Sequence, residues 1–505
     1  MRLDLVSSEP RARLLRWTCL LGLAAVYLLS LRAYYVGFFN DDAFYIIGAR
    51  SLLRGGFREL SAPGEPPLLN YLPGYPALLA QWSWFFGESL LAAQILSVIM
   101  TVAGVCLTWA CFSAELPPAV AFAAAAVTGF NPLTVSMSGT VLSDLPYLLM
   151  TLLVFIAARA VWDRQSARGW AGLGALAGAA FLIRPTGAAL GTALVLCLLW
   201  ERRWRAAAWA AAGAALLAGP WLLRNIWAGG VPLSHAAELA EPWRTTSALP
   251  GLLERLARNA AYYAPELFWR TLFRWPQGPI SVLKWLTVGL GLAAVAAGLR
   301  GWGSRGWRKL LTVYLLVYAA LHLELHLQSG RYVFTALPMC VVLLFLGVAA
   351  ADRRLGLKGR AVWAAAALSL ALSLAPVANV VRTSLWRHTP LNTPPARTLA
   401  WIKSGTAPAD LFAAELDGRL YLLADRHAVR LRKLYDPEGL RSWLRDAGVA
   451  YVLLAPTDYF MTTISGATAH DPMPLDRLRT LLADGRRYCR VFADAAEGTE
   501  IYRVR

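Results

Sequence analysis

The sequence predicts a polytopic α-helical membrane protein with about eleven transmembrane helices, followed by a small C-terminal α/β domain. Of its 505 residues, 57% are hydrophobic and only 16% are charged, whereas soluble domains average roughly 25% charged residues. Apolar blocks recur as far as Val381, each near the ~20 residues that cross a bilayer core. The net charge of +18 would suggest nucleic acid in a soluble protein, but the arginines lie in connectors between apolar blocks, so we expect no nucleic-acid partner.

The membrane domain is expected to occupy residues 1–381. We place its spans at residues 14–35, 90–112, 119–133, 144–162, 170–183, 187–200, 206–223, 280–299, 310–327, 333–351 and 362–381. Basic residues cluster before the first span and in most alternate connectors, for example at Arg202, Arg203 and Arg205. By the positive-inside rule these connectors and the N-terminus face the cytoplasm, and an odd number of spans places the C-terminus outside.

The first apolar block follows a basic segment, as in a cleaved secretory signal. No small-residue cleavage site follows it, so we expect a retained span. Inside the fifth span, Gly174 and Gly178 form a small-xxx-small face, which predicts close helix packing.

Three stretches are expected outside the membrane: residues 36–89, 225–279 and 382–505. In the last of these, charges of both signs return. Short β-prone runs at residues 410–414, 450–454, 488–492 and 500–504 alternate with helical patterns at 437–447 and 475–483. These patterns predict an α/β domain on the outer side.

Polar residues at the outer boundary are the candidates for function, because ionisable groups are expensive near the apolar core. Asp41 and Asp42 directly follow the first span, and they either serve chemistry or a cation, or they cap the following helix. Asn70, Tyr71 and Tyr75 lie in a turn-rich segment that either shapes a substrate site or re-enters the interface.

Further polar residues stand at the ends of later spans. Asp144 begins the fourth span, where it either caps the helix or binds substrate. Arg184, Arg224 with Asn225, and Arg331 with Tyr332 stand at outer ends, where positive residues are disfavoured. The arginines either reach lipid phosphates singly or bind one anionic ligand together, because guanidinium groups bind phosphate bidentately.

His322 and His326 lie four residues apart near the outer end of the ninth span. This spacing permits a metal site, a phosphate or substrate contact, or plain interfacial polarity. Phosphate-loop, dinucleotide-binding and nucleophile-elbow motifs are missing from the sequence, so activity driven by cytoplasmic ATP is not expected.

The order of these features resembles integral-membrane glycosyltransferases of the GT-C fold. The similarity is to the family-39-type branch that contains the protein O-mannosyltransferases, the aminoarabinose lipid A transferases and their bacterial relatives. The segments that resemble this branch are NDDAFYIIGARSLLRGG, NYLPGYPALLAQWSWFFG, SDLPYLLMTLLVF, LAGAAFLIRPTG, PWLLRN and RYVFTALP, between Asn40 and Pro338.

The resemblance implies roles for individual residues. Asp41 matches the catalytic base, Asp42 takes the second acidic position, and Arg331 is expected near the donor phosphate. Arg184 and Arg224 occupy recurrent positions that suit the same phosphate. The aminoarabinose transferases carry a Glu-Lys-Pro-Pro motif in the first outer loop, whereas this chain reads Asn-Tyr-Leu-Pro at residues 70–73, so the donor sugar does not carry over.

The implied activity is that of an inverting hexosyl- or pentosyltransferase of the bacterial inner membrane. It would use a polyprenyl-phosphate-linked sugar and glycosylate a lipid, glycan or protein acceptor on the periplasmic face, with a divalent cation left open. Expected contacts to the substrate come from Asn70, Tyr71, Tyr75, Asp144, Asn225, His326 and Tyr332. The alternatives are a transporter or flippase of a lipid-linked sugar, which broken spans in matching halves would favour, and a noncatalytic envelope scaffold.

Overall fold

The computed structural model describes residues 10–164, 166–229, 248–268, 281–304, 306–325, 328–389, 391–431, 436–455 and 475–505. The chain forms two compact units. The first comprises Met1–Ala33, Leu91–Leu325 and Gly330–Trp386, and the second comprises Tyr34–Leu90, His326–Ser329 and Arg387–Arg505.

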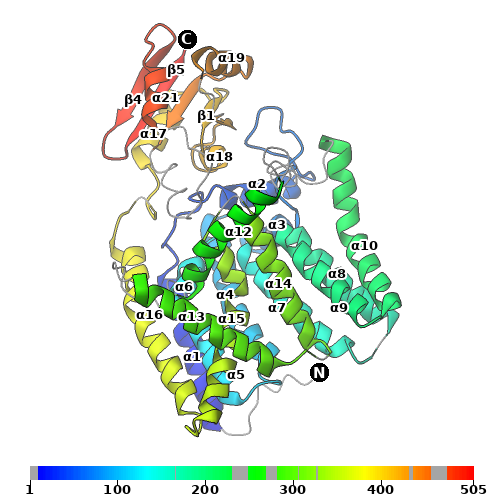
Figure 1. The fold of residues 1–505 in the computed structure, drawn as a ribbon. Coiled ribbons are helices and arrows are strands. Elements are labelled where there is room, and N and C mark those ends of the chain that lie inside the picture. The colour runs from blue at the N-terminus through cyan, green and yellow to red at the C-terminus, as the bar shows by residue number, and fades with distance from the viewer. Residues whose placement is uncertain are drawn as a thin grey trace. The chain divides into compact units, whose positions relative to one another are not determined.

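The first unit is helical (Figure 1). Its main helices are α1 (Pro10–Leu29), α4 (Leu90–Phe112), α5 (Pro118–Gly129), α6 (Pro132–Met137), α7 (Asp144–Val161), α8 (Ala167–Ile183), α9 (Ala188–Trp200), α10 (Trp204–Gly229), α12 (Ala248–Pro265), α13 (Ser281–Trp302), α14 (Arg308–Glu324), α15 (Tyr332–Arg354) and α16 (Arg360–Trp386). The short 3-10 turn η1 (Pro185–Gly187) separates α8 from α9.

Each predicted span falls on one of these helices, but their lengths differ. Among the described residues, six helices are long and apolar enough to cross a membrane: α4, α7, α10, α13, α15 and α16. Four further apolar helices are shorter, in α1, α5, α8 and the segment Pro185–Trp200. The helical, multi-pass architecture is thereby confirmed, while the number of spans stays a prediction.

Helix α5 is shorter than the third expected span, which was predicted to run from residue 119 to residue 133. The helix ends at Gly129, and the side chain of Asn131 then accepts a hydrogen bond from the Leu133 amide, where α6 begins. Pro132 at the first position of α6 suits a new helix start, because its missing N–H would have no intrahelical partner there. At 12 residues, α5 spans roughly 18 Å, less than the ~30 Å bilayer core.

Glycines bring two helix pairs into backbone contact. A Cβ atom on Gly174 of α8 would collide with the Ala210 carbonyl of α10, and one on Gly213 would collide with the Ala171 carbonyl. The pair α13 and α15 is built in the same way around Gly298. The predicted small-residue packing of the fifth span is therefore confirmed (Figure 1).

The second unit contains a mixed five-stranded sheet with the strand order β2-β1-β3-β5-β4. Its strands are β1 (Phe412–Ala414), β2 (Ala428–Arg430), β3 (Tyr451–Leu454), β4 (Tyr488–Asp494) and β5 (Thr499–Val504), and the helices α17 (Ala396–Gly405), α18 (Asp417–Ala424), α19 (Pro437–Asp446) and α21 (Leu475–Leu482) accompany them. β1 pairs in parallel with β2 and β3, whereas β5 runs antiparallel to β3 and β4. The four expected strands and both expected helices are present, while β2, α17 and α18 were not anticipated.

The first loop that the sequence predicts outside the membrane, residues 36–89, belongs to this same unit. It forms α2 (Asp41–Leu53) and α3 (Gly74–Phe86), which pack together, and α2 also packs on α18. The amide of Ala428 donates to the Ser61 carbonyl at 2.9 Å, so the loop also attaches at strand β2. This association was not anticipated from the sequence, because the two stretches are separated by the whole predicted membrane domain.

Candidate functional site

The acidic pair opens α2, and its two carboxylates have different surroundings. Both oxygens of Asp42 accept backbone hydrogen bonds, Oδ2 from Gly37 at 2.7 Å and Oδ1 from Ala43 at 3.0 Å, and the residue is buried. Asp41 is only half-buried, and its Oδ1 accepts a hydrogen bond from the Tyr71 hydroxyl at 3.1 Å. Asp42 thus holds the chain entering α2, whereas Asp41 is the more accessible of the two acids.

Burial shifts the protonation of the acids in this unit. It raises the pKa of Asp42 to about 7, against the backbone hydrogen bond from Gly37, and the neighbouring Asp41 charge raises it further. Burial and the charge of Asp417 likewise raise the pKa of Glu59 to about 7. For Asp417 itself, burial raises the pKa and the hydrogen bond from Asn40 opposes the rise. Near neutral pH the carboxyl groups of Asp42 and Glu59 are therefore partly protonated.

Aromatic rings fix the position of Tyr71. Its ring stacks on Phe44 with centroids 4.8 Å apart, and Tyr45 meets it edge-on at 5.4 Å. Tyr45 in turn contacts Tyr75, which is fully buried, while Asn70 is exposed. Of the three expected substrate contacts in this segment, the structure therefore brings Tyr71 to the acidic pair and packs Tyr75 inside.

A second cluster lies in the helical unit and joins three residues that the sequence singled out separately. Nη1 of Arg184 lies 2.6 Å from Oδ1 of Asp144, and Nε of Arg331 lies 3.5 Å from Oδ2 of the same carboxylate. The Asp144 side chain is 1% exposed, so these are buried ion pairs. A buried protein carboxylate therefore lies between these two arginines.

Local sequence positions each member of this cluster. Asp144 is the first residue of α7, where the helix dipole favours a negative charge. Arg184 ends α8 with φ −151° and ψ 136°, the extended conformation that a following proline favours. Arg331 immediately precedes α15. Since each residue stands at the end of a helix, the cluster forms where helix ends meet.

Aromatic and hydroxyl groups surround these ion pairs. The Arg184 guanidinium lies 5.5 Å from the ring centroid of Tyr332, and the Tyr318 hydroxyl donates to the Tyr332 carbonyl at 2.8 Å. The hydroxyls of Tyr147 and Tyr314 lie 3.2 Å apart. Tyr314 and Tyr318 escaped the sequence analysis, although their spacing of four with His322 along α14 was a usable signal.

His322 is buried between aromatic rings. Its Nδ1 lies 2.8 Å from the Tyr318 carbonyl, and its ring centroid lies 4.1 Å from that of Tyr318. Asn259 was also missed from the sequence: its side-chain amide donates to the carbonyls of Leu323 and Leu325, both at 2.7 Å, and so closes the C-terminal end of α14. His326 lies outside the described residues.

The third arginine contacts its own helix. Arg224 Nη1 donates to Oδ1 of Asn225 at 3.0 Å, and its guanidinium lies 4.6 Å from the Trp221 ring centroid. Asn225 is fully buried. In the part of the chain that the structure describes, no group of three or more His, Cys, Asp or Glu side chains is arranged to hold a metal ion.

Comparison with known proteins gives the class of this fold. Residues 65–223 match the family described as dolichyl-phosphate-mannose-protein mannosyltransferase. Among curated proteins, no significant match is found. Because the family match covers about a third of the chain, the solved structures extend the comparison to the rest.

Two proteins of known structure share the architecture. The oligosaccharyltransferase AglB from Archaeoglobus fulgidus, in complex with an inhibitory peptide and a dolichol-phosphate, aligns with a TM-score of 0.57 at 12% identity over 89% of this chain and 71% of its own. ArnT from Cupriavidus metallidurans bound to undecaprenyl phosphate aligns with a TM-score of 0.54 at 13% identity over 96% of this chain and 97% of its own. The chain therefore has the GT-C fold, and its resemblance to the branch with the protein O-mannosyltransferases is confirmed.

Proposed function

We propose that the protein is an inverting glycosyltransferase that uses a polyprenyl-phosphate-linked sugar as donor. The observation that supports this best is the unequal acidic pair, in which backbone amides occupy Asp42 while Asp41 remains half-buried beside Tyr71. The similar AglB and ArnT structures were solved with dolichol-phosphate and undecaprenyl phosphate, respectively. The acceptor is a lipid, glycan or protein on the periplasmic face of a bacterial inner membrane.

Asp41 acts as the general base in the proposed reaction. It accepts the proton of an acceptor hydroxyl, the hydroxyl oxygen bonds to the anomeric carbon, and the bond from that carbon to the phosphate oxygen breaks with inversion. The polyprenyl phosphate leaves with the bonding electrons. General base catalysis contributes roughly 10²–10⁴-fold to rates of this kind.

The second cluster binds the leaving phosphate in this proposal. Arg184 and Arg331 bring two guanidinium groups to the carboxylate of Asp144, and guanidinium groups bind phosphate bidentately. Arg224 adds a further positive group. Guanidinium groups that face the leaving phosphate stabilise the charge that grows on it in the transition state. Asp144 serves as a positioning residue, because it holds both arginines by their ion pairs.

The test is Asp41→Asn in full-length protein, with labelled polyprenyl-phosphate sugar as donor. We expect transfer to fall by roughly 10²–10⁴-fold while the variant remains folded, because asparagine keeps an oxygen for the Tyr71 hydroxyl. Glu88→Gln is the matched control: Glu88 is a half-exposed acid of the same unit, paired with Arg50 at 3.2 Å. Activity of Asp41→Asn near that of the wild type would refute the assignment.

The same assay separates the transporter alternative. Transfer or hydrolysis of the donor supports the enzyme, whereas movement of intact donor across proteoliposomes without bond cleavage supports a flippase. Repeating the assay with a chelator determines whether a divalent cation takes part.

A further inference from the structure

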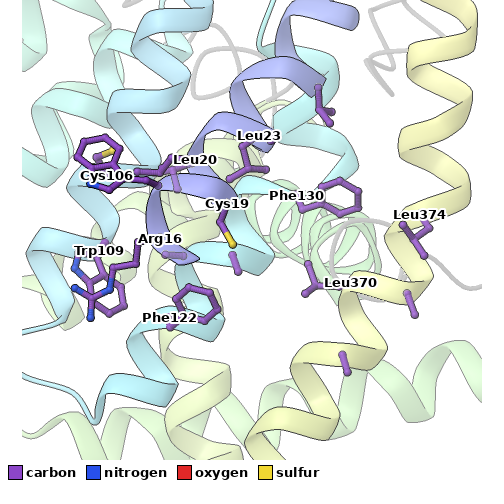
Figure 2. A pocket seen from close by; sticks show the side chains of 18 residues that line it. Arg16, Cys19, Leu20, Leu23, Cys106, Trp109, Phe122, Phe130, Leu370 and Leu374 are labelled. Carbon is purple, nitrogen blue, oxygen red and sulfur yellow. The ribbon is translucent and has the colours of Figure 1, made fainter. Parts of the chain in front are cut away.

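The helical unit contains a large apolar cavity that shares no residue with either cluster. Its volume is about 730 Å³, within the roughly 300–1,000 Å³ typical of ligand pockets. Helices α1, α4, α5 and α16 line it (Figure 2). Of the described residues that line this cavity, Arg16 is the only charged one.

The cavity includes residues at the predicted cytoplasmic ends of its helices. Arg16 lies near the start of α1, Trp109 near the end of α4, and Ala367 in the first half of α16. The charge map of the sequence places all three of these helix ends toward the cytoplasm. The cavity therefore reaches the ends of these helices that the sequence predicts to be cytoplasmic, and it extends along them as far as Val26 in α1 and Phe130 just after α5.

Arg16 stands at this otherwise apolar cavity in a fixed position. Its guanidinium lies 4.8 Å from the ring centroid of Trp109, and the two side chains lie beside each other in Figure 2. A cation–π contact of this kind holds the positive charge next to the apolar surface. An apolar chamber with one cation matches a hydrocarbon chain that ends in an anionic group.

Two of the residues that line the cavity are more than half exposed. Trp17 and Leu374, which line it, are 58% and 59% exposed, values that suit contact with hydrocarbon rather than water in a membrane helix. Gly22 also lines the cavity, and a Cβ atom added there would meet nothing within 4 Å. The small residue thus leaves open space that a chain can fill.

We propose that this cavity binds an acyl chain of an anionic phospholipid from the cytoplasmic leaflet, with Arg16 contacting the lipid phosphate. The anionic lipids of that leaflet supply the complementary charge. This site is independent of the proposed transferase activity, because none of its residues belongs to either cluster.

Native mass spectrometry of the full-length protein in detergent tests this proposal, with added phosphatidylglycerol or phosphatidylethanolamine as probe. We expect the wild type to retain one phosphatidylglycerol molecule that Arg16→Gln binds about tenfold more weakly, as for a lost charge-assisted hydrogen bond. Gly22→Leu, which fills the cavity, should weaken retention similarly. Gly172→Leu is the matched control, since Gly172 is also an open helix glycine but does not line the cavity.

Three results would overturn the proposal. Equal retention of both phospholipids would show that charge plays no part. Equal retention by the wild type, Arg16→Gln and Gly22→Leu would show that the lipid only coats the surface of the bundle. Displacement of phosphatidylglycerol by equimolar undecaprenyl phosphate would identify the donor lipid as the occupant.

Discussion

Replacing Asp144 with asparagine tests whether its carboxylate holds Arg184 and Arg331 in place. The substitution preserves shape but removes the charge that pairs with Arg184 at 2.6 Å and Arg331 at 3.5 Å. The three side chains are 1%, 8% and 17% exposed, so water cannot replace the lost partner. Breaking a buried ion pair in this way costs about 3–5 kcal/mol. Because the unfolding entropy is about 2.1 cal/mol/K per residue, or roughly 1.1 kcal/mol/K for 505 residues, we expect the apparent Tm of the purified protein to fall by roughly 3–5 °C.

A double variant separates loss of the ion pairs from loss of packing. Arg184→Gln removes the positive charge that pairs with Asp144, so the arginine substitution should cost less in the Asp144→Asn background than in the wild type. Thermal unfolding with undecaprenyl phosphate extends the test: a phosphate that binds these arginines should raise the Tm of Asp144→Asn more than that of the wild type. Full wild-type stability of Asp144→Asn, or strict additivity of the two substitutions, would refute the reasoning.

Three further outcomes are expected from single changes. Gly174→Ala should lower the Tm and Gly172→Ala should not, because only the first added methyl group meets the Ala210 carbonyl. Tyr71→Phe should lower kcat without unfolding the protein, since it removes the hydrogen bond to the proposed base; an unchanged kcat would contradict that role. The pKa of Glu59 rises from 4.5 to about 7 on folding, so between these pH values the folded state binds more protons than the unfolded state. The free energy of unfolding therefore falls as the pH rises through this range. Glu59→Gln should flatten that slope by less than about 1.4 kcal/mol per pH unit, with urea unfolding at pH 4.5 and 8 as the measurement.

The sequence predicted the helices and most strands because their signals are local. Apolar blocks, turn residues and β-prone runs are complete within short windows, so α4 begins and ends at the expected residues. The short strand β2 has only three residues, too few for alternation to register, and it forms because β1 and the Ser61 carbonyl offer partners. Partners of that kind come from distant parts of the chain and leave no local pattern.

The same distinction applies to the candidate site. Charge in an unfavourable place identified Arg184 and Arg331 one at a time, since each breaks the positive-inside pattern by itself. Their shared carboxylate depends on how α7, α8 and α15 pack, which the helix-cap interpretation of Asp144 could not anticipate. Conversely, Tyr314, Tyr318 and His322 recur every four residues, so the aromatic face of α14 could have been predicted from the sequence. A tyrosine at helical spacing is commonly a packing residue, however, so the pattern alone does not indicate a functional site.

The C-terminal domain helps to define the conformation of the proposed base. Asn40 precedes Asp41 in the left-handed region at φ 59°, which asparagine tolerates better than most residues. Its amide nitrogen donates to Asp417 Oδ1 at 3.1 Å, and its oxygen accepts from the Arg419 amide at the same distance. A side chain on Gly418 would collide with Phe44, so helix α18 can approach the start of α2 only because that position is glycine. The backbone that presents Asp41 is therefore anchored by residues almost four hundred positions later, and the tail has a direct physical role in the proposed chemistry.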